Sequence, residues 1–505
     1  MMLLIVFGAS YMAYNLEAYS ADPLSQFGES TELNKETLIA RMIRELHLDV
    51  PPPIRYFIWF RGIIGGLWGQ FDLGLTRSHV PVWDTIAMAI PVTFRLVIAS
   101  TILAIVLGIT IGMVTAIRQY SRFDYVITFV SFLLFSLPIF WVAVLLKEFM
   151  AIQFNDFLEV PQIPIPLLVV FALVSGFIMA GILGGSRRRF LMVFAGVSVG
   201  TAALLQYMSV TNWFITPGIG IIGVAVFAFG FAALVTQVST GLDNRKSLIS
   251  ALSASAVVTA GYYPLQMLMG ADANGLSVLL IFIITCGLAA AIAYFVEVND
   301  RRINVRTAII TAFLGTLPLI LDRFMGEFGE YLNSDAITGR PMPTLGERND
   351  LLNEEQMANF WISGLDAAMH LILPTIALTL ISFAGYVRFS RGSLLEVLNM
   401  DYIRTARAKG LTERTVIVRH GMRNAMLPLT TILVNDFAGV IGGAIITESV
   451  FAWKGMGSVF NEALRNYDLN LFMGVFVLSA TLTVMANFVA DLLYGVVDPR
   501  IRIRK

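Results

Sequence analysis

The sequence predicts an all-α polytopic membrane protein, and composition is the first observation that points there. Of 505 residues, 57% are hydrophobic and only 14% are charged, whereas a soluble protein carries about 25% charged residues. The mean hydropathy is +0.74. The one cysteine, Cys286, excludes an intrachain disulfide and a cysteine metal cluster. The net charge of zero argues against a basic surface for nucleic acid.

The second observation is a series of about twelve apolar segments that approach the roughly 20 residues needed to cross a bilayer. The segment 248–268 is weaker because it is rich in Ser and Ala and contains Pro264, and 305–321 is short. Without those two, ten spans remain. The first segment lacks a basic leader, which suggests a truncated or misassigned start. The expected spans are 2–18, 92–117, 125–150, 165–184, 190–210, 214–238, 248–268, 277–297, 305–321, 370–387, 429–447 and 472–494.

The third observation is the placement of Lys and Arg in alternate loops, which predicts orientation because these residues concentrate on the cytoplasmic side. The outer loops 151–164, 211–213 and 269–276 contain neither residue. The C-terminus is therefore predicted to lie in the cytoplasm, and the protein in a plasma or inner membrane. The predicted inner loops and tail contain Arg118, Arg122, Arg187, Arg188, Arg189, Arg245, Lys246, Arg301, Arg302, Arg306, Arg500, Arg502, Arg504 and Lys505.

Two predicted outer segments are long. In residues 19–91, the stretch 55–69 alternates Trp, Phe and Ile with Gly and Arg, which predicts a helix lying in the outer interface. An ordinary packed loop is the alternative. Residues 322–368 are acidic and are expected to form a water-exposed cap or docking surface.

Residues 388–428 form a basic segment that is too patterned for a simple turn. Tyr402, Ile403 and Ala406 have helical spacing, Gly410 fits a helix C-cap, and Thr412 fits the N-cap of a second helix. The pattern predicts two helices joined at Gly410 that present a small amphipathic surface to the cytoplasm. Such a surface could insert into a groove of a soluble partner or bind anionic lipid.

The stretch DYIRTARAKGLTERTVIVRHGMRNAMLPL, residues 401–429, resembles the cytoplasmic "EAA" loop of permease subunits of the dipeptide/oligopeptide/nickel ABC importers. The resemblance covers residues 55–150 and 369–504. Lys454 replaces the family's usual proline, and Asp436 replaces its customary glutamine. Further matching segments are FDLGL at 71–75, SLPIFW at 136–141, HLILP at 370–374, SLLEV at 393–397, the glycine-rich stretch 442–457 and DLLYGVVDPRIR at 491–502.

The resemblance implies a type I ABC-importer permease core of about six transmembrane helices, with about six more inserted between core helices three and four. An even number of inserted spans preserves the topology on both sides. The sequence does not indicate what the insert does. The implied divisions are a first helix at 1–18, an outer loop at 19–91, core helices at 92–150, inserted helices at 151–321, an acidic outer loop at 322–368, and core helices with the coupling loop at 369–505.

No GxxxxGK[ST] phosphate loop occurs, so this chain is not expected to be an enzyme or to bind a cofactor or metal. The resemblance implies that two ABC ATPase subunits supply Mg-ATP hydrolysis, beside a second homologous permease and an extracytoplasmic solute-binding protein. Short peptides are the first substrate prediction, with nickel chelates or another small solute as alternatives. An ATPase-independent secondary transporter and a receptor or scaffold remain open.

Three groups of site residues follow. The resemblance places the ATPase-coupling helix at Tyr402, Arg404, Ala406, Arg407, Lys409, Gly410 and Leu411, and binding-protein docking at Trp453, Gly455 and Gly457. Polar groups within core spans are pathway candidates because an intramembrane charge costs about 2.5–3.5 kcal/mol. These are Arg95, which could instead snorkel to the interface, and Asn435 and Asp436, the latter of which could instead pair with the second permease.

Overall fold

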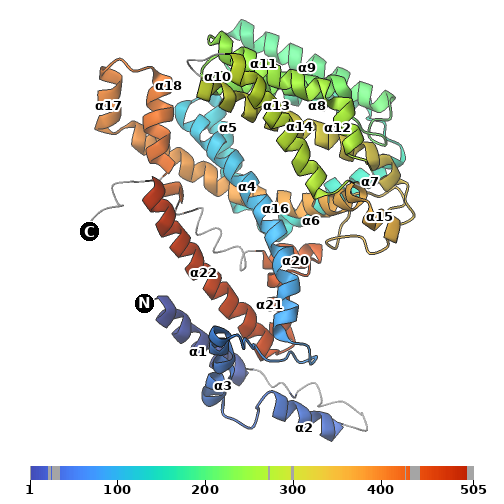
Figure 1. Cartoon of the computed structure of the whole chain (residues 1–505), viewed down its shortest axis with the longest axis vertical. Helices are drawn as coiled ribbons and strands as arrows, with labels where there is room; N and C mark the ends of the chain where they lie inside the picture. Colours follow the sequence, from blue (N-terminus) through green and yellow to red (C-terminus); the bar gives the residue numbers. More distant parts are fainter. Residues whose placement is uncertain are drawn as a thin grey trace. The chain divides into compact units, whose positions relative to one another are not determined.

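The computed structural model describes residues 2–20, 24, 35–270, 273–296, 301–426, 428–430, 432 and 444–497. Within those residues the fold is helical, and the one β contact is an isolated bridge between Leu75 and Pro81. The chain divides into two compact units, each described here by itself (Figure 1). Unit 1 comprises 1–148, 344–347 and 371–505, and unit 2 comprises 149–343 and 348–370.

Unit 1 is built from the two ends of the chain. Prolines begin several of its helices, because Pro is tolerated in the first turn, where its missing N–H is not needed. Pro81 and Pro138 are N-caps, and Ser121 caps the helix after it by accepting the N–H of Asp124. Its helices are α1 Met2–Ser20, α2 Lys35–Glu45, α3 Pro52–Gly65, η2 Gly66–Trp68, α4 Val82–Ile117, α5 Arg122–Ser136, α6 Ile139–Leu146, α17 Asp401–Ala408, α18 Glu413–Thr415, the π-helix η4 Val416–Gly421, α20 Ile445–Phe451, α21 Met456–Arg465 and α22 Leu469–Val497.

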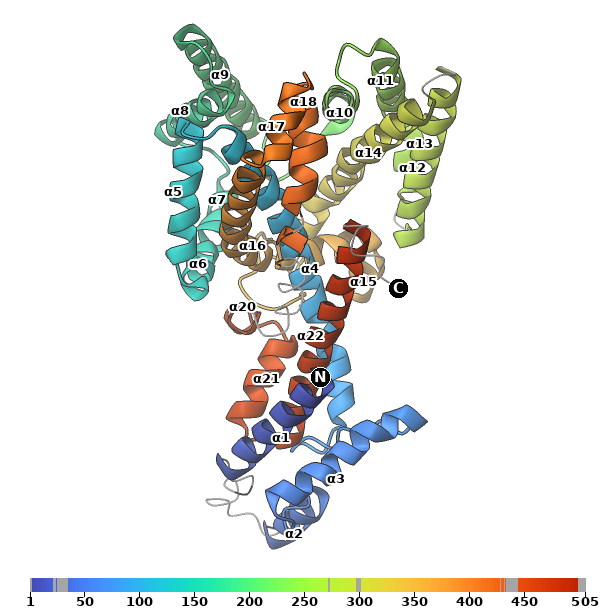
Figure 2. The same cartoon turned by 90° about the vertical axis from the view of Figure 1, so that its left-hand side faces the viewer.

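Helix α16, Phe360–Leu398, crosses from unit 2 into unit 1 and packs there on α4 through two glycines. A Cβ at Gly108 would lie 2.4 Å from the Cβ of Tyr386, and one at Gly112 would lie 1.9 Å from Ser390 Oγ. Only hydrogen fits at these positions, which is how small residues bring membrane helices together. Elsewhere in unit 1, α22 packs on α1, α4 and α21 (Figure 2).

Unit 2 is mostly one continuous stretch of chain. Its core is lined by small residues, among them Ala228, Ala254, Ala308 and Ala312, which let α10, α11, α13 and α14 pack closely. Helices α8 and α9 form a second packed pair. Its helices are η3 Lys147–Ile152, a π-helix at the unit boundary, then α7 Gln153–Glu159, α8 Ile165–Leu183, α9 Arg187–Val210, α10 Gly220–Ser239, α11 Arg245–Ala260, α12 Tyr262–Leu268, α13 Gly275–Val296, α14 Arg301–Leu332 and α15 Glu354–Ala358.

Two buried carboxylates hold unit 2 together. Asp322 accepts the backbone N–H groups of Ile219 (2.6 Å) and Gly220 (2.8 Å) at the start of α10. Asp366 accepts the Tyr331 hydroxyl at 3.0 Å, and its backbone carbonyl lies 2.8 Å from His370 Nδ1. Since a buried charge is costly unless it is hydrogen-bonded, these contacts fix the positions of several helices at once.

Within the described residues, eight helices are long and apolar enough to cross a membrane, or up to ten if each bent pair is one span. The bent pairs are 122–136 with 139–159, and 245–260 with 262–268. These ten correspond to ten of the expected segments, and the protein is a multi-pass membrane protein. Residues 2–18 form most of α1, which does not pass that test. Of the expected span 429–447, residues 431 and 433–443 lie outside the described residues.

Two element boundaries differ from expectation. The stretch 55–69 is helical, as predicted, through α3 and η2, but Arg55, Tyr56 and Trp59 are buried. The expected outer loop 322–368 is much shorter, because α14 continues to Leu332 and α16 begins at Phe360. The connecting residues are also not simply exposed, since Ile337, Met342 and Leu352 are buried.

Candidate functional site

The predicted coupling segment is a compact hairpin made of α17, α18 and η4, drawn in orange in Figure 1. Ile403, Ala406 and Val416 form its buried core, packed against Val397 and Leu398 at the end of α16. The two predicted helices are therefore present, and they enclose an apolar core of their own. The second helix passes into a π-helix at Val416–Gly421, a form often found at functional sites.

Gly410 makes the turn between the two helices. Its φ is +74°, a left-handed conformation that disfavours any residue with a Cβ. Its N–H donates to the Arg407 carbonyl at 2.9 Å, while the Leu411 N–H donates to the Ala406 carbonyl. A Cβ at Gly410 would meet nothing within 4 Å, so backbone conformation rather than crowding requires glycine here. Thr412 begins the second helix by accepting the Thr415 N–H at 3.4 Å, as predicted.

The outer face of the hairpin is cationic and exposed. Tyr402, Arg404, Arg407, Lys409 and Leu411 are all exposed. Ala406, by contrast, is buried in the hairpin core. The small side chain at position 406 lets α17 lie close to η4.

Arg407 is held within the hairpin by Glu413. The guanidinium donates to both carboxylate oxygens, at 2.6 and 3.1 Å. This pairing lowers the pKa of Glu413 and raises the pKa of Arg407. Arg404 lies 3.4 Å from Asp401. Arg404 and Arg407 thus have carboxylate partners in this chain, so any acid on another protein would compete with Asp401 and Glu413.

The base of the hairpin is fastened to the rest of unit 1. Asn424 Nδ2 donates to the Tyr402 hydroxyl at 2.7 Å, and Ser393 Oγ donates to the Ala425 carbonyl at 2.8 Å. Arg391 near the end of α16 makes a two-bond contact with the buried carboxylate of Asp124 on α5, at 2.8 and 3.0 Å. The ion pair was not predicted, because its partners are 267 residues apart and both lie just outside the expected spans, where charged residues are ordinary.

A second assembly forms around Glu448, a fully buried carboxylate on α20. Thr93 Oγ1 donates to Glu448 Oε1 at 2.6 Å and accepts the Met456 N–H at 2.7 Å. The Ser458 N–H donates to Glu448 Oε2 at 2.8 Å. Burial raises the pKa of Glu448, against the opposing effect of these hydrogen bonds. The carboxylate thereby joins α4, α20 and α21 into one corner.

The three predicted docking residues lie inside this corner. Trp453, Gly455 and Gly457 are all buried within this chain, and their proposed role in binding-protein docking stays a prediction. A Cβ at Gly455 would lie 2.4 Å from Glu448 Oε1, and one at Gly457 would lie 2.7 Å from the Ile445 backbone. These glycines make room for the corner, and Lys454 between them is exposed.

Next to this corner, Asp468 and Asn470 bind the segment that precedes α4. Asp468, also buried, accepts the backbone N–H of Arg77 at 2.7 Å and of Leu471 at 3.1 Å. Burial raises the pKa of Asp468. Asn470 Nδ2 donates to the Leu75 carbonyl at 2.9 Å. The FDLGL segment at 71–75 is therefore held against the start of α22.

The predicted pathway residues are only partly placed. Arg95 is exposed on α4, two residues after Thr93. Asn435 and Asp436 lie outside the described residues. Among the residues that the structure describes, no group of three or more His, Cys, Asp or Glu side chains could hold a metal ion.

Comparison with known proteins identifies a related domain. Residues 283–503 match the model of the family described as "Binding-protein-dependent transport system inner membrane component". The dipeptide transport system permease protein DppB of Escherichia coli K12 is 49% identical over 141 residues, which are 28% of this chain and 42% of that protein. The oligopeptide transport system permease protein AppB of Bacillus subtilis 168 is 46% identical over 136 residues, 27% of this chain and 43% of that protein.

A third relative is the di/tripeptide transport system permease protein DppB of Pseudomonas aeruginosa UCBPP-PA14. It is 43% identical over 152 residues, which are 30% of this chain and 44% of that protein. The chain thus spans less than half the length of these curated relatives. The matched residues include the hairpin and, of the Glu448 corner, α20 and α21 but not Thr93 on α4. Residues 283–503 are therefore similar to inner membrane components of binding-protein-dependent transport, and the relatives that match part of this region are permease proteins of peptide transport systems.

Proposed function

We propose that this protein is a permease subunit of an ABC importer, which forms the path for short peptides and is driven by ATPases on separate chains. The observation that carries the proposal is the hairpin around Gly410. It has its own apolar core, a turn that requires glycine, and an exposed cationic face. A small, stiff surface of this kind can dock in a groove of a soluble partner and transmit a movement.

The proposal extends to partners that follow from the related permeases. Two ATPase subunits would bind the hairpins of this chain and of a second, similar permease, and Mg-ATP would be held by those subunits. An extracytoplasmic binding protein would deliver the peptide. The path between the permeases would open alternately to each side as the ATPases close and reopen. The hairpin and the C-terminus would then face the cytoplasm.

Replacement of Gly410 by leucine tests the coupling role. A left-handed residue with a Cβ costs about 1–2 kcal/mol, so the turn should change shape. In vesicles containing the complete complex, we expect peptide uptake to fall about tenfold or more, which is the effect of roughly 1.4 kcal/mol. ATP hydrolysis should continue and the protein should remain in the membrane. Uptake at the unaltered rate would contradict the proposal.

Gly339→Leu is the matched control. Gly339 also has a left-handed φ, +77°, and a Cβ there would also meet nothing within 4 Å. The same strain is therefore introduced in a turn of unit 2 that has no proposed contact with the ATPases. Equal loss of uptake in both variants would attribute the effect to general destabilisation and would also contradict the coupling role.

A further inference from the structure

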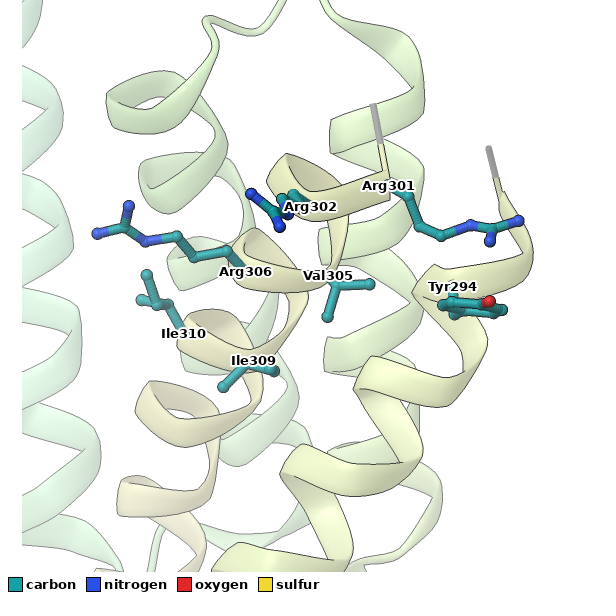
Figure 3. Close-up of a pocket in the computed structure, with 7 residues that line it drawn as sticks. All are labelled: Tyr294, Arg301, Arg302, Val305, Arg306, Ile309 and Ile310. Carbon is teal, nitrogen blue, oxygen red and sulfur yellow. The ribbon is translucent and has the colours of Figure 1, made fainter. Parts of the chain in front are cut away.

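A cavity of about 450 Å³ opens between the facing ends of α13 and α14 in unit 2 (Figure 3). The function proposed above makes no use of it. Its rim carries three arginines and its floor is apolar. The lining residues are Tyr294, Arg301, Arg302, Val305, Arg306, Ile309 and Ile310.

The positive charge of this rim lies at the N-terminus of a helix, where the helix dipole disfavours cations. Arg301, Arg302 and Arg306 occupy the first turns of α14, which has no acidic residue in its first turn. Cations near a helix N-terminus oppose the helix dipole, and Arg302 and Arg306, one turn apart, repel each other. Across the described parts of the chain, none of the three forms an ion pair with a carboxylate. A bound anion would relieve both effects.

Arg301 is positioned by the neighbouring helix. Its guanidinium lies 3.9 Å from the centre of the Tyr294 ring at the end of α13, and Figure 3 shows it above that ring. Its Nε is enclosed, without an acceptor among the described residues. The rim thus combines Tyr294 of α13 with the arginines of α14, and the Nε–H of Arg301 donates no hydrogen bond to a described residue.

The floor suits hydrocarbon rather than water. The floor is formed by Val305, which lies between Arg302 and Arg306, and by Ile309 and Ile310 farther along α14, and each of these two isoleucines is 38% exposed. Both α13 and α14 qualify as membrane spans. With 32 residues, α14 is about 48 Å long, more than the roughly 30 Å of hydrocarbon. Its first turns therefore reach headgroup depth while the isoleucines stay near the acyl chains.

We propose that this cavity binds an anionic phospholipid, with the phosphate between Arg302 and Arg306 and an acyl chain along Ile309 and Ile310. Basic pockets between membrane helices bind acidic headgroups on the cytoplasmic side. A soluble phosphate would contact the arginines but would leave the apolar floor without a partner. The site would hold unit 2 at a fixed depth and orientation in an acidic leaflet.

The test uses the purified full-length protein in nanodiscs of phosphatidylcholine with a small fraction of phosphatidylglycerol. Native mass spectrometry counts the phosphatidylglycerol molecules that each protein retains. We expect Arg302→Gln/Arg306→Gln to weaken retention at one site about 30-fold, about fivefold for each arginine. Arg302→Lys/Arg306→Lys, which keeps both charges, should retain most of the binding and shows whether substitution here preserves the fold.

A matched control separates this site from general charge attraction. Arg187 and Arg188 begin α9, are exposed and also lie in a predicted cytoplasmic loop. Arg187→Gln/Arg188→Gln should leave retention at the site unchanged. Equal losses in the two glutamine variants, or no loss in either, would overturn the proposal. Displacement of the lipid by millimolar inorganic phosphate would also overturn it, since the site would then recognise a soluble anion.

Discussion

Glu448 is a buried carboxylate that has no cationic partner among the residues that the structure describes. Among the described residues its charge is met by dipoles, which are the Thr93 hydroxyl and the backbone N–H groups of Ser458 and Gly457. Burial disfavours the ionised form more than these hydrogen bonds favour it, so its pKa lies above the ordinary value. The neutral acid can still accept the hydrogen bonds of Thr93 and Ser458. The corner of α4, α20 and α21 is therefore expected to be more stable with Glu448 protonated.

This gives a pH dependence with a definite sign. A raised folded-state pKa contributes stability below the unfolded value, about 4.3, and that contribution is lost as pH rises through the folded-state pKa. Glu448→Gln removes the ionisation while keeping the shape. From about pH 4 to pH 7, we expect the melting temperature of the unaltered protein to fall relative to Glu448→Gln. Thermal unfolding in detergent measures this, with the exposed Glu462→Gln on α21 as control. A constant difference across that range would refute it.

At the scale of elements, two ion pairs near the hairpin have different environments. Asp124 has a side chain only 3% exposed and ties α5 to Arg391 on α16, whereas Arg407 and Glu413 are 42% and 56% exposed. Water and salt screen the second pair, and exposed pairs contribute little. The first pair replaces water on a carboxylate that is otherwise enclosed. The α5–α16 contact should therefore depend far more on its ion pair than the hairpin does.

Double-mutant cycles compare the two pairs. For Asp124→Asn with Arg391→Gln we expect a coupling energy of about 2 kcal/mol, typical of enclosed, charged hydrogen bonds. For Arg407→Gln with Glu413→Gln we expect about 0.5 kcal/mol. Denaturant unfolding in mixed micelles supplies the free energies. Equal values for the two cycles would show that enclosure of Asp124 has no energetic consequence.

The helices were more predictable from sequence than their ends and contacts. Apolar length identifies a span because it reflects lipid thickness, and most spans were found. The end of α14 was missed because Asp322 marks the chain as polar there, although its carboxylate is used to cap α10. The glycines 455 and 457 were recognised by resemblance, but their role in the packing of the Glu448 corner was not predicted. That role depends on Thr93, which is 355 residues from Glu448. No local pattern encodes such a contact.

For the whole molecule, the arrangement of spans makes a prediction about sides. If unit 2 contributes an even number of crossings, position 188 and position 409 lie on the same side. Cys286→Ala gives a background without cysteine, into which Arg188→Cys, Lys409→Cys, Leu351→Cys or Lys454→Cys is introduced. All four positions are exposed. An impermeant maleimide should label the last two in intact cells and the first two only after permeabilisation. If Arg188→Cys and Lys409→Cys were labelled from opposite sides of the membrane, unit 2 could not contribute an even number of crossings.

The division of unit 1 between the two ends of the chain has a consequence for biosynthesis. Thr93, Asp124 and Arg77 meet their partners only when Glu448, Arg391 and Asp468 have left the ribosome. Residues 149–370 take roughly 10–45 s to translate at 5–20 residues per second. During that interval the N-terminal helices are in the bilayer before the hydrogen-bond partners of Thr93, Asp124 and Arg77 have been made, while unit 2 can already assemble. Insertases or lipids that shield those helices would then govern the yield of folded protein.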